Sequence, residues 1–85
     1  MMEQKSRIPR AFGEVLREPR TEKRFSQEAL ATESDLDRKL VYLPERGQRQ
    51  PSFTTIFKLA KALKISPNKI VKRVEKKMGK NFIRR

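Results

Sequence analysis

Apolar residues recur along this chain at the spacing that lines one face of an α-helix. They stand three and four residues apart in each stretch, whereas no alternation typical of a β-strand persists for more than a few residues. The spacing predicts helices over about residues 10–23, 26–33 and 37–46, and two more helices that start at Ser52 and Ser66. The chain is therefore expected to be all-α, with five helices.

Residues that cap helices stand where these stretches begin and end. The expected N-caps are Ser26, Asp37, Ser52 and Ser66. Pro67 follows at a first helical position, where its missing N–H costs nothing, and Gly47 ends the third helix. The residues expected in or near the core include Phe12, Val15, Leu16, Phe25, Leu30, Ala31, Leu36, Val41, Phe53, Ile56, Phe57, Leu59, Ala60, Leu63, Ile70 and Val74.

The charge balance narrows the class of partner. Lys and Arg number 22 against 10 Asp and Glu, which leaves a net charge of +12 on 85 residues. Such an excess favours a polyanion, whether nucleic acid, an anionic membrane surface or an acidic protein. Seven basic residues fall within residues 71–85 against the single acid Glu75, so residues 76–85 are expected to form a basic tail that attracts phosphate without specificity.

Several function classes are excluded by what the chain lacks. It contains no cysteine and no histidine, which removes the thiolate nucleophile and the commonest general base and metal ligand. With three glycines it also has no Gly-rich phosphate loop, so neither an enzyme nor a cofactor is expected. No apolar run approaches the ~20 residues that a membrane span needs, so the expected location is cytoplasmic, with no membrane partner.

The elements predicted over residues 26–46 follow the order of a helix-turn-helix: a short capped helix, a tight turn and a second capped helix whose first turn is basic. The second helix of such a pair can enter the major groove and place its N-terminal side chains at base edges. The first helix can lay its N-terminal N–H groups against a phosphate. An RNA partner is less favoured, because no aromatic platform for stacking bases is evident.

Four short motifs follow one another in this region. They are Ser-Gln-Glu-x-Leu-Ala at 26–31, Glu-Arg-Gly at 45–47, Pro-Ser at 51–52 and Lys-Leu-Ala-Lys-Ala-Leu at 58–63. With these motifs in this order, about residues 12–74 resemble the Cro/cI-type (Xre) family, to which phage lambda-like repressors belong. The resemblance implies a five-helix, lambda-repressor-like DNA-binding domain over residues 10–75, between an N-terminal arm (1–9) and the basic tail.

The resemblance also implies a function and its residues. The chain would bind double-stranded DNA as a homodimer on a palindromic operator and regulate transcription, as a repressor. The implied DNA-binding residues are Ser26, Gln27, Asp37, Arg38, Lys39, Tyr42, Arg46, Gln48 and Arg49. Among them, Gln27 and the loop after the second helix would contact phosphate, whereas Arg38 and Lys39 would contact base edges, where Arg suits guanine. The competing interpretation of Arg38 and Lys39 is that of ordinary solvated charges, and Tyr42 would touch DNA or only pack.

The comparison with the family also identifies a structural ion pair and several positions at which this sequence differs from the family pattern. Arg20 and Glu45 match a family pair that joins helix one to the end of helix three. Pro19 and Pro44 stand inside helices, where each costs ~3 kcal/mol, so helix one is expected to kink and helix three to end early or bend near Leu40. Two further positions where glycine is usual, and which favour positive φ, are held by Arg24 and Asp35.

Several functions remain open on sequence alone. A restriction–modification controller, a phage or plasmid repressor and an antitoxin all fit the motif. The alternative class is a protein-interaction module that uses the same fold, with a toxin or polymerase as partner. A dimer seam on helix five, with Met78, Phe82 and Ile83, is one expectation.

Overall fold

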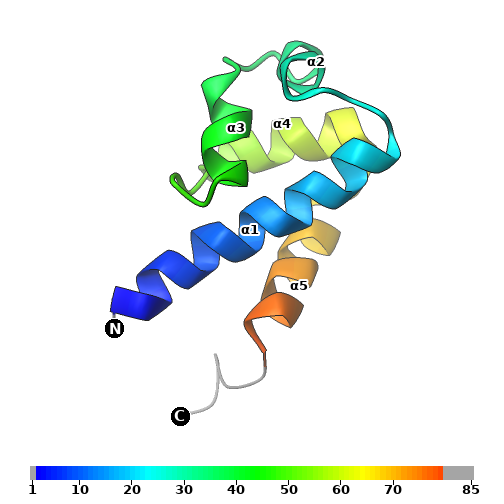
Figure 1. Ribbon diagram of the computed structural model, residues 1–85. Coiled ribbons are helices and arrows are strands. Elements are labelled where there is room, and N and C mark those ends of the chain that lie inside the picture. The colour runs from blue at the N-terminus through cyan, green and yellow to red at the C-terminus, as the bar shows by residue number, and fades with distance from the viewer. Residues whose placement is uncertain (1, 80–85) are drawn as a thin grey trace.

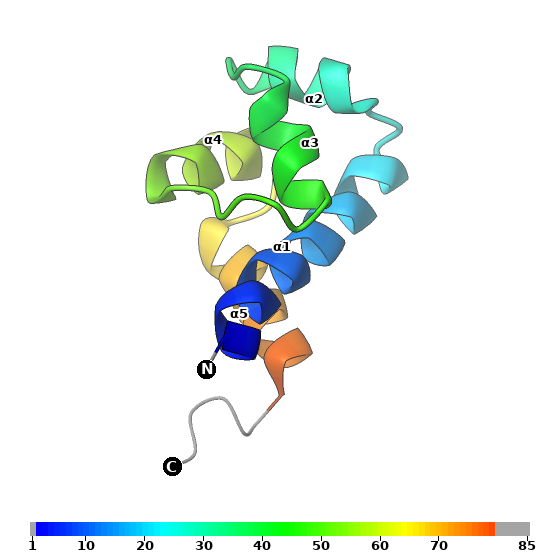
Figure 2. The same cartoon turned by 60° about the vertical axis from the view of Figure 1, so that its left-hand side comes forward.

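Five helices and no strand make up residues 2–79, the part of the chain that the computed structural model describes, with side chains described from residue 7 (Figure 1). The helices are α1 (Met2–Glu22), α2 (Gln27–Glu33), α3 (Lys39–Glu45), α4 (Phe53–Leu63) and α5 (Pro67–Met78). The long α1 runs diagonally through the fold, with α2 and α3 at one end and α5 at the other (Figures 1 and 2). The predicted all-α, five-helix fold is confirmed.

The first helix is longer than its sequence pattern indicates. It begins at Met2 rather than near Arg10 and continues through Pro9, so residues 2–9 of the expected N-terminal arm are helical. Contacts with the far end of the chain explain the extension. Ile8 is half-buried, and Arg7 Nη2 donates a hydrogen bond to the Met78 carbonyl at 2.8 Å. These contacts with α5 lie far outside any local sequence window.

The two prolines at which a kink or an early end was expected, Pro19 and Pro44, are accommodated inside their helices. The expected early end of the third helix is wrong, because α3 continues past Leu40 to Glu45. Pro44 lies in the last turn, so only the Leu40 carbonyl loses its donor, and the ring is fully buried. Pro19 is also buried, and α1 continues beyond it to Glu22.

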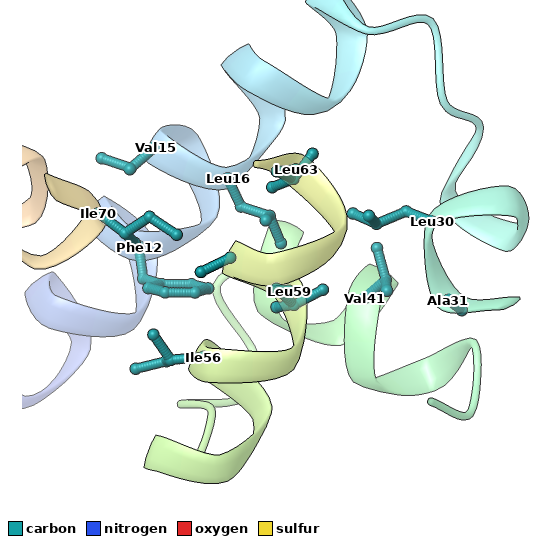
Figure 3. Close-up of a cluster of buried hydrophobic side chains, with 11 residues drawn as sticks. Phe12, Val15, Leu16, Leu30, Ala31, Val41, Ile56, Leu59, Leu63 and Ile70 are labelled. Carbon is teal, nitrogen blue, oxygen red and sulfur yellow. The ribbon is translucent and has the colours of Figure 1, made fainter. Parts of the chain in front are cut away.

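The core gathers one apolar face from each helix (Figure 3). Phe12 and Leu16 of α1 lie beside the stripe of α4, and Val41 of α3 faces Leu30 of α2. The buried cluster comprises Phe12, Val15, Leu16, Leu30, Ala31, Val41, Ile56, Leu59, Ala60, Leu63 and Ile70. Each large aliphatic side chain removed from water contributes about 1.5–3 kcal/mol, so the helix-turn-helix is fixed to the rest of the fold chiefly by burial.

Three of the four predicted N-cap residues, Ser26, Ser52 and Ser66, stand at N-cap positions, but the Ser66 side chain makes no capping bond. Ser26 Oγ accepts from Ala29 N at 2.9 Å, and Ser52 Oγ accepts from Thr55 N at 3.1 Å. Asp37 was expected as the N-cap of α3, but Arg38 occupies that position. The Asp37 carboxylate instead accepts from Lys39 N at 3.0 Å, which folds the segment just before the helix into a turn.

Three residues other than glycine adopt the left-handed backbone conformation. Arg24, Asp35 and Lys64 have φ of 61°, 58° and 58°, and each lies just after a helix. The positive φ expected at Asp35 is confirmed, and Arg24 does stand where glycine is the usual choice. These positions reverse the chain tightly enough to bring successive helices together, although each carries a backbone cost.

Arg24→Gly is expected to raise the free energy of unfolding by about 0.5–1 kcal/mol. The left-handed conformation costs a residue with a Cβ roughly 1–2 kcal/mol, and part of that gain is offset by the greater freedom of glycine in the unfolded chain. Thermal unfolding measures the change. The neighbouring Lys23→Gly is the control: Lys23 has no positive φ, so this variant should lose stability. A loss in both variants would contradict the explanation.

Candidate nucleic-acid interface

The turn between α2 and α3 sets the angle of the exposed helix α3. After α2 ends, Asp35 takes the left-handed conformation and Leu36 N donates to the Ala31 carbonyl at 2.8 Å. Val41 and Pro44 bury the inner side of α3 in the core. In Figure 2, α3 and α2 stand together at one end of the molecule, away from α5. This arrangement anchors the inner side of α3 and leaves its outer side uncovered.

The outer side of α3 begins with two exposed cations. Arg38 and Lys39 are both exposed, and neither takes part in an ion pair among the described residues. The nearby Asp37 carboxylate is occupied by the Lys39 backbone N–H. The first turn of α3 therefore presents a net positive surface, at the end of the helix that would lead into a groove of DNA.

Tyr42 lies between two guanidinium groups on this helix. The Arg38 Cζ atom is 5.3 Å from the centre of the Tyr42 ring, and the Arg46 Cζ atom is 5.1 Å from it. The three residues are four apart, so they follow one another along one side of the helix. Each cation–π contact is worth about 0.5–1 kcal/mol at an exposed site. Tyr42 is only half-buried, and its ring restrains both arginines rather than filling the core.

Arg20 and Glu45 are brought together as the family resemblance implied. The Glu45 side chain is 0% exposed and that of Arg20 is 12% exposed. Arg20 binds both carboxylate oxygens, with Nη2 to Oε1 at 2.9 Å, and its Nη1 donates to the Phe25 carbonyl at 2.7 Å. This two-point pairing joins α1 to the last turn of α3 and to the segment that starts α2.

Gln27 also contacts Glu45. Its Nε2 donates to Glu45 Oε1 at 2.9 Å, so part of the amide expected to meet DNA phosphate is used inside the protein. The contact places the start of α2 beside the last turn of α3. Ser26 remains exposed next to it, with its hydroxyl capping α2.

The remaining predicted residues follow α3. Arg46, Gln48 and Arg49 are all exposed, and Gly47 makes the turn between them with φ of 73°. Gln48 N donates to the Leu43 carbonyl at 2.9 Å, which ties this loop to the helix. The structure thus places the predicted residues on α3, on the segments just before and after it, and at the start of α2.

Two residues at this site were not identified from the sequence. Arg17 Nε lies 3.5 Å from Glu45 Oε1, and its Nη2 donates to the Glu45 backbone carbonyl at 3.3 Å. Gly13 lets α1 approach the end of α3: a Cβ at this position would overlap the Pro44 carbonyl oxygen and lie 3.0 Å from that of Glu45. A glycine inside an amphipathic helix is the signal for such an approach, whereas nothing in the pattern marks Arg17.

An apolar face on α4 and α5 contradicts part of the predicted core. Phe53 is 78% exposed and Phe57 is 59% exposed, because they point away from the stripe of α4 that packs inward. Val71 of α5 is also exposed, and these three residues define the apolar face. Met78, expected at a dimer seam, is buried in its own chain. Phe82 and Ile83 lie outside the described residues.

None of the described helices is both long and apolar enough to cross a membrane. Residues 2–79 also contain no group of three or more acidic side chains placed to hold a metal ion.

A protein-family model and several solved structures match this chain. The family model HTH_3, described as helix-turn-helix, matches residues 16–70, from α1 into α5. The crystal structure of the restriction-modification controller protein C.AhdI from Aeromonas hydrophila is 52% identical over 73% of this chain and 94% of its own, with a TM-score of 0.70. No curated protein matches the sequence.

Two further solved structures share the fold. C.Esp1396I bound to a 19 base pair DNA duplex is 27% identical over 86% of this chain and 97% of its own, with a TM-score of 0.74. The clp gene regulator ClgR from Corynebacterium glutamicum is 23% identical, covers 88% of this chain and 80% of its own, and has a TM-score of 0.78.

Proposed function

The chain belongs to the helix-turn-helix family, of the Cro/cI type that its motifs predicted, and we propose that it regulates transcription by binding an operator in double-stranded DNA as a homodimer. The proposal rests on the exposed cations at the first turn of α3. Arg38 and Lys39 project from a helix whose inner side is anchored by Val41 and Pro44. The major groove admits an α-helix in this orientation, and base edges there distinguish all four base pairs.

The exposed residues divide into two roles. Arg38 has the planar fork that binds guanine O6 and N7, and Lys39 lies beside it for a base or a phosphate. Arg46, Gln48 and Arg49 would hold the phosphate backbone after α3, and Ser26 and Gln27 would contact it at the start of α2. The Tyr42 ring restrains Arg38, which lowers the entropy lost when that side chain meets a base.

The apolar face supports the homodimer. Its three exposed large apolar side chains lie on two adjacent helices, and a gathered apolar patch of this kind is a common feature of protein interfaces. A second copy related by a twofold axis would present the same face, and Phe53 and Phe57 would supply the aromatic contacts that dominate such interfaces. Two α3 helices in one dimer would then read a palindromic operator.

The 52% identity to a restriction-modification controller protein supports a role in the control of restriction-modification genes. The mechanism that we propose is occupancy of a promoter, which blocks transcription. A reporter gene behind the selected operator tests this role. Lower expression in the presence of the protein would support repression, whereas higher expression would contradict it.

Selection of bound sequences from a random duplex pool at near-physiological salt tests the central proposal. We expect enrichment of one sequence repeated as two inverted half-sites, with centres about one or more helical turns apart, roughly 10 base pairs each. Failure to enrich any sequence would contradict sequence-specific binding. Enrichment of a single half-site would contradict the homodimer.

Arg38→Ala and Arg49→Ala are expected to have different effects on binding. Loss of Arg38 should cost about 1–3 kcal/mol on the preferred operator and relax the preference at one base pair. Loss of Arg49 should weaken binding to all sequences alike and lower the slope of log affinity against log salt by about one. Titrations against the operator and its single-base variants would show the difference, and equal effects on every sequence from both variants would contradict the assigned roles.

Phe57→Glu is expected to convert the homodimer into a folded monomer, because a charge at the centre of an apolar interface must be desolvated. Since Phe57 is exposed in the single chain, its replacement should leave helicity unchanged. Sedimentation equilibrium measures the mass. Thr32→Glu, which adds the same charge on α2, is the control and should stay dimeric. A wild-type protein that is already monomeric would contradict the homodimer and favour a different protein partner for this face.

A further inference from the structure

A second cationic surface lies on α5 and has no role in the proposed operator complex. Lys69, Lys72, Arg73 and Lys76 stand at the positions i, i+3, i+4 and i+7, so they share one face of the helix, the α5 basic face. All four are exposed, and the opposite side of the helix is buried in the core through Ile70 and Met78.

Folding alone does not account for these charges. The ion pairs among the described residues are Arg17–Glu45, Arg20–Glu45 and Lys77–Glu14, and none involves the α5 basic face. The dipole of α5 favours cations near its C-terminal end, which explains Lys76. It opposes Lys69 in the first turn, and neighbouring like charges destabilise the helix further. A face that costs stability in this way is expected to meet a polyanion.

The α5 basic face is directed away from the outer side of α3. It adjoins the apolar face at Lys72, which lines a hollow together with Phe53, Phe57 and Val71. Figures 1 and 2 show α5 at the end of the molecule opposite α2 and α3. Helix α5 packs on α1 and α4. Lys69 and Arg73 each lie two residues from Val71, about 200° around the helix at 100° per residue, so burial of the apolar face in a homodimer leaves them exposed.

We propose that the α5 basic face binds the phosphate backbone of a second DNA duplex, so that the operator-bound homodimer bridges two segments of DNA. From Lys69 to Lys76 the helix rises about 10 Å, a length over which a DNA duplex presents several backbone phosphates. Four cations without an aromatic or amide side chain among them suit phosphates rather than base edges, so this contact is independent of sequence and sensitive to salt. The inference rests on the proposed function for the operator-bound half of the complex.

Co-capture of two duplexes tests the bridge. A biotinylated operator duplex is immobilised and loaded with protein, free protein is washed away, and a fluorescent duplex of unrelated sequence is added. The face variant carries Lys69→Gln, Arg73→Gln and Lys76→Gln, which spares Lys72 beside Val71. The matched control carries Lys23→Gln, Arg24→Gln and Lys64→Gln and loses the same charge from exposed positions elsewhere.

We expect the wild type and the control to co-capture the second duplex, and the face variant to bind operator normally while losing most of the co-capture. In the face variant, the salt slope of second-duplex binding should fall by about one for each phosphate contact removed. The inference would be overturned if the face variant co-captured as much as the wild type, or if the control lost as much as the face variant. It would also be overturned if the wild type failed to co-capture the second duplex, a result that would point to an acidic protein as the partner. A random-pool selection that yields no operator is instead a failure of the proposed function.

Discussion

Glu45→Ala is expected to lower the free energy of unfolding by about 3–5 kcal/mol, the usual cost of removing one partner from a buried ion pair. The Arg20 guanidinium, which is 12% exposed, would lose the carboxylate that it binds at two points, and the Gln27 amide would lose its acceptor. A small domain has about 5–15 kcal/mol of stability in total, so the variant should be close to unfolding at physiological temperature. Urea unfolding followed by circular dichroism measures the change.

The exposed pair between Glu14 and Lys77 provides the control. It joins α1 to α5 at 3.2 Å with both side chains substantially exposed, so Glu14→Gln should cost at most about 1 kcal/mol. The double variant Arg20→Ala/Glu45→Ala should lose less than the sum of the two single variants, because the pair is removed together. A cost for Glu45→Ala no greater than that for Glu14→Gln would refute the assignment of Glu45 as the buried link between α1, α2 and α3.

Gly13→Ala is expected to destabilise the fold by about 2–3 kcal/mol, even though alanine is the better helix former by about 1 kcal/mol. The new Cβ would overlap the Pro44 carbonyl oxygen and approach the Glu45 carbonyl oxygen to 3.0 Å. Both atoms belong to backbone, so no side chain can rotate out of the way and α3 must shift from α1. In a domain of this size the melting temperature should fall by roughly 10–20 °C, since 1 kcal/mol corresponds to about 4–8 °C.

Glu18→Ala separates the effect of this contact from that of helix propensity. It lies on the exposed side of the same helix and should change stability by less than about 0.5 kcal/mol. If Gly13→Ala were as stable as the wild type, the close approach of α1 to the end of α3 would not be required. Titration of the folded fraction of each variant with operator would then show whether a shift of α3 also weakens DNA binding.

Both predictions concern the contact between α1 and the end of α3, the helix that we propose enters the major groove. Gly13, Arg17 and Arg20 of α1 all meet the last turn of α3 around Glu45. The opposite end of α3 is held by the turn at Asp35 and by the Asp37 carboxylate. The exposed cations of the first turn are therefore positioned by contacts at both ends of a seven-residue helix, which has little stability of its own.

The sequence by itself determined the features that depend on neighbouring residues. Periodicity predicted five helices, and the serines at 26 and 52 cap α2 and α4 as expected. The positive φ at Asp35 was expected from the comparison with the family, in which glycine is usual in this turn. The pairing of Arg20 with Glu45, 25 residues apart, was available only through the resemblance to a family. Capping bonds and helical periodicity involve residues within one or two helical turns of each other, so a short stretch of sequence is enough to predict them.

Only the tertiary structure decided which surfaces are covered. It extended α1 to Met2 through contacts with α5, including a hydrogen bond that spans 71 residues. It left Phe53 and Phe57 exposed although both are apolar residues in an amphipathic helix, and it turned the Gln27 amide toward Glu45. Whether a residue is buried depends on which helix lies opposite it. The free energy of the whole core, which includes the packing of distant segments, determines which helices lie opposite each other, and no local pattern does.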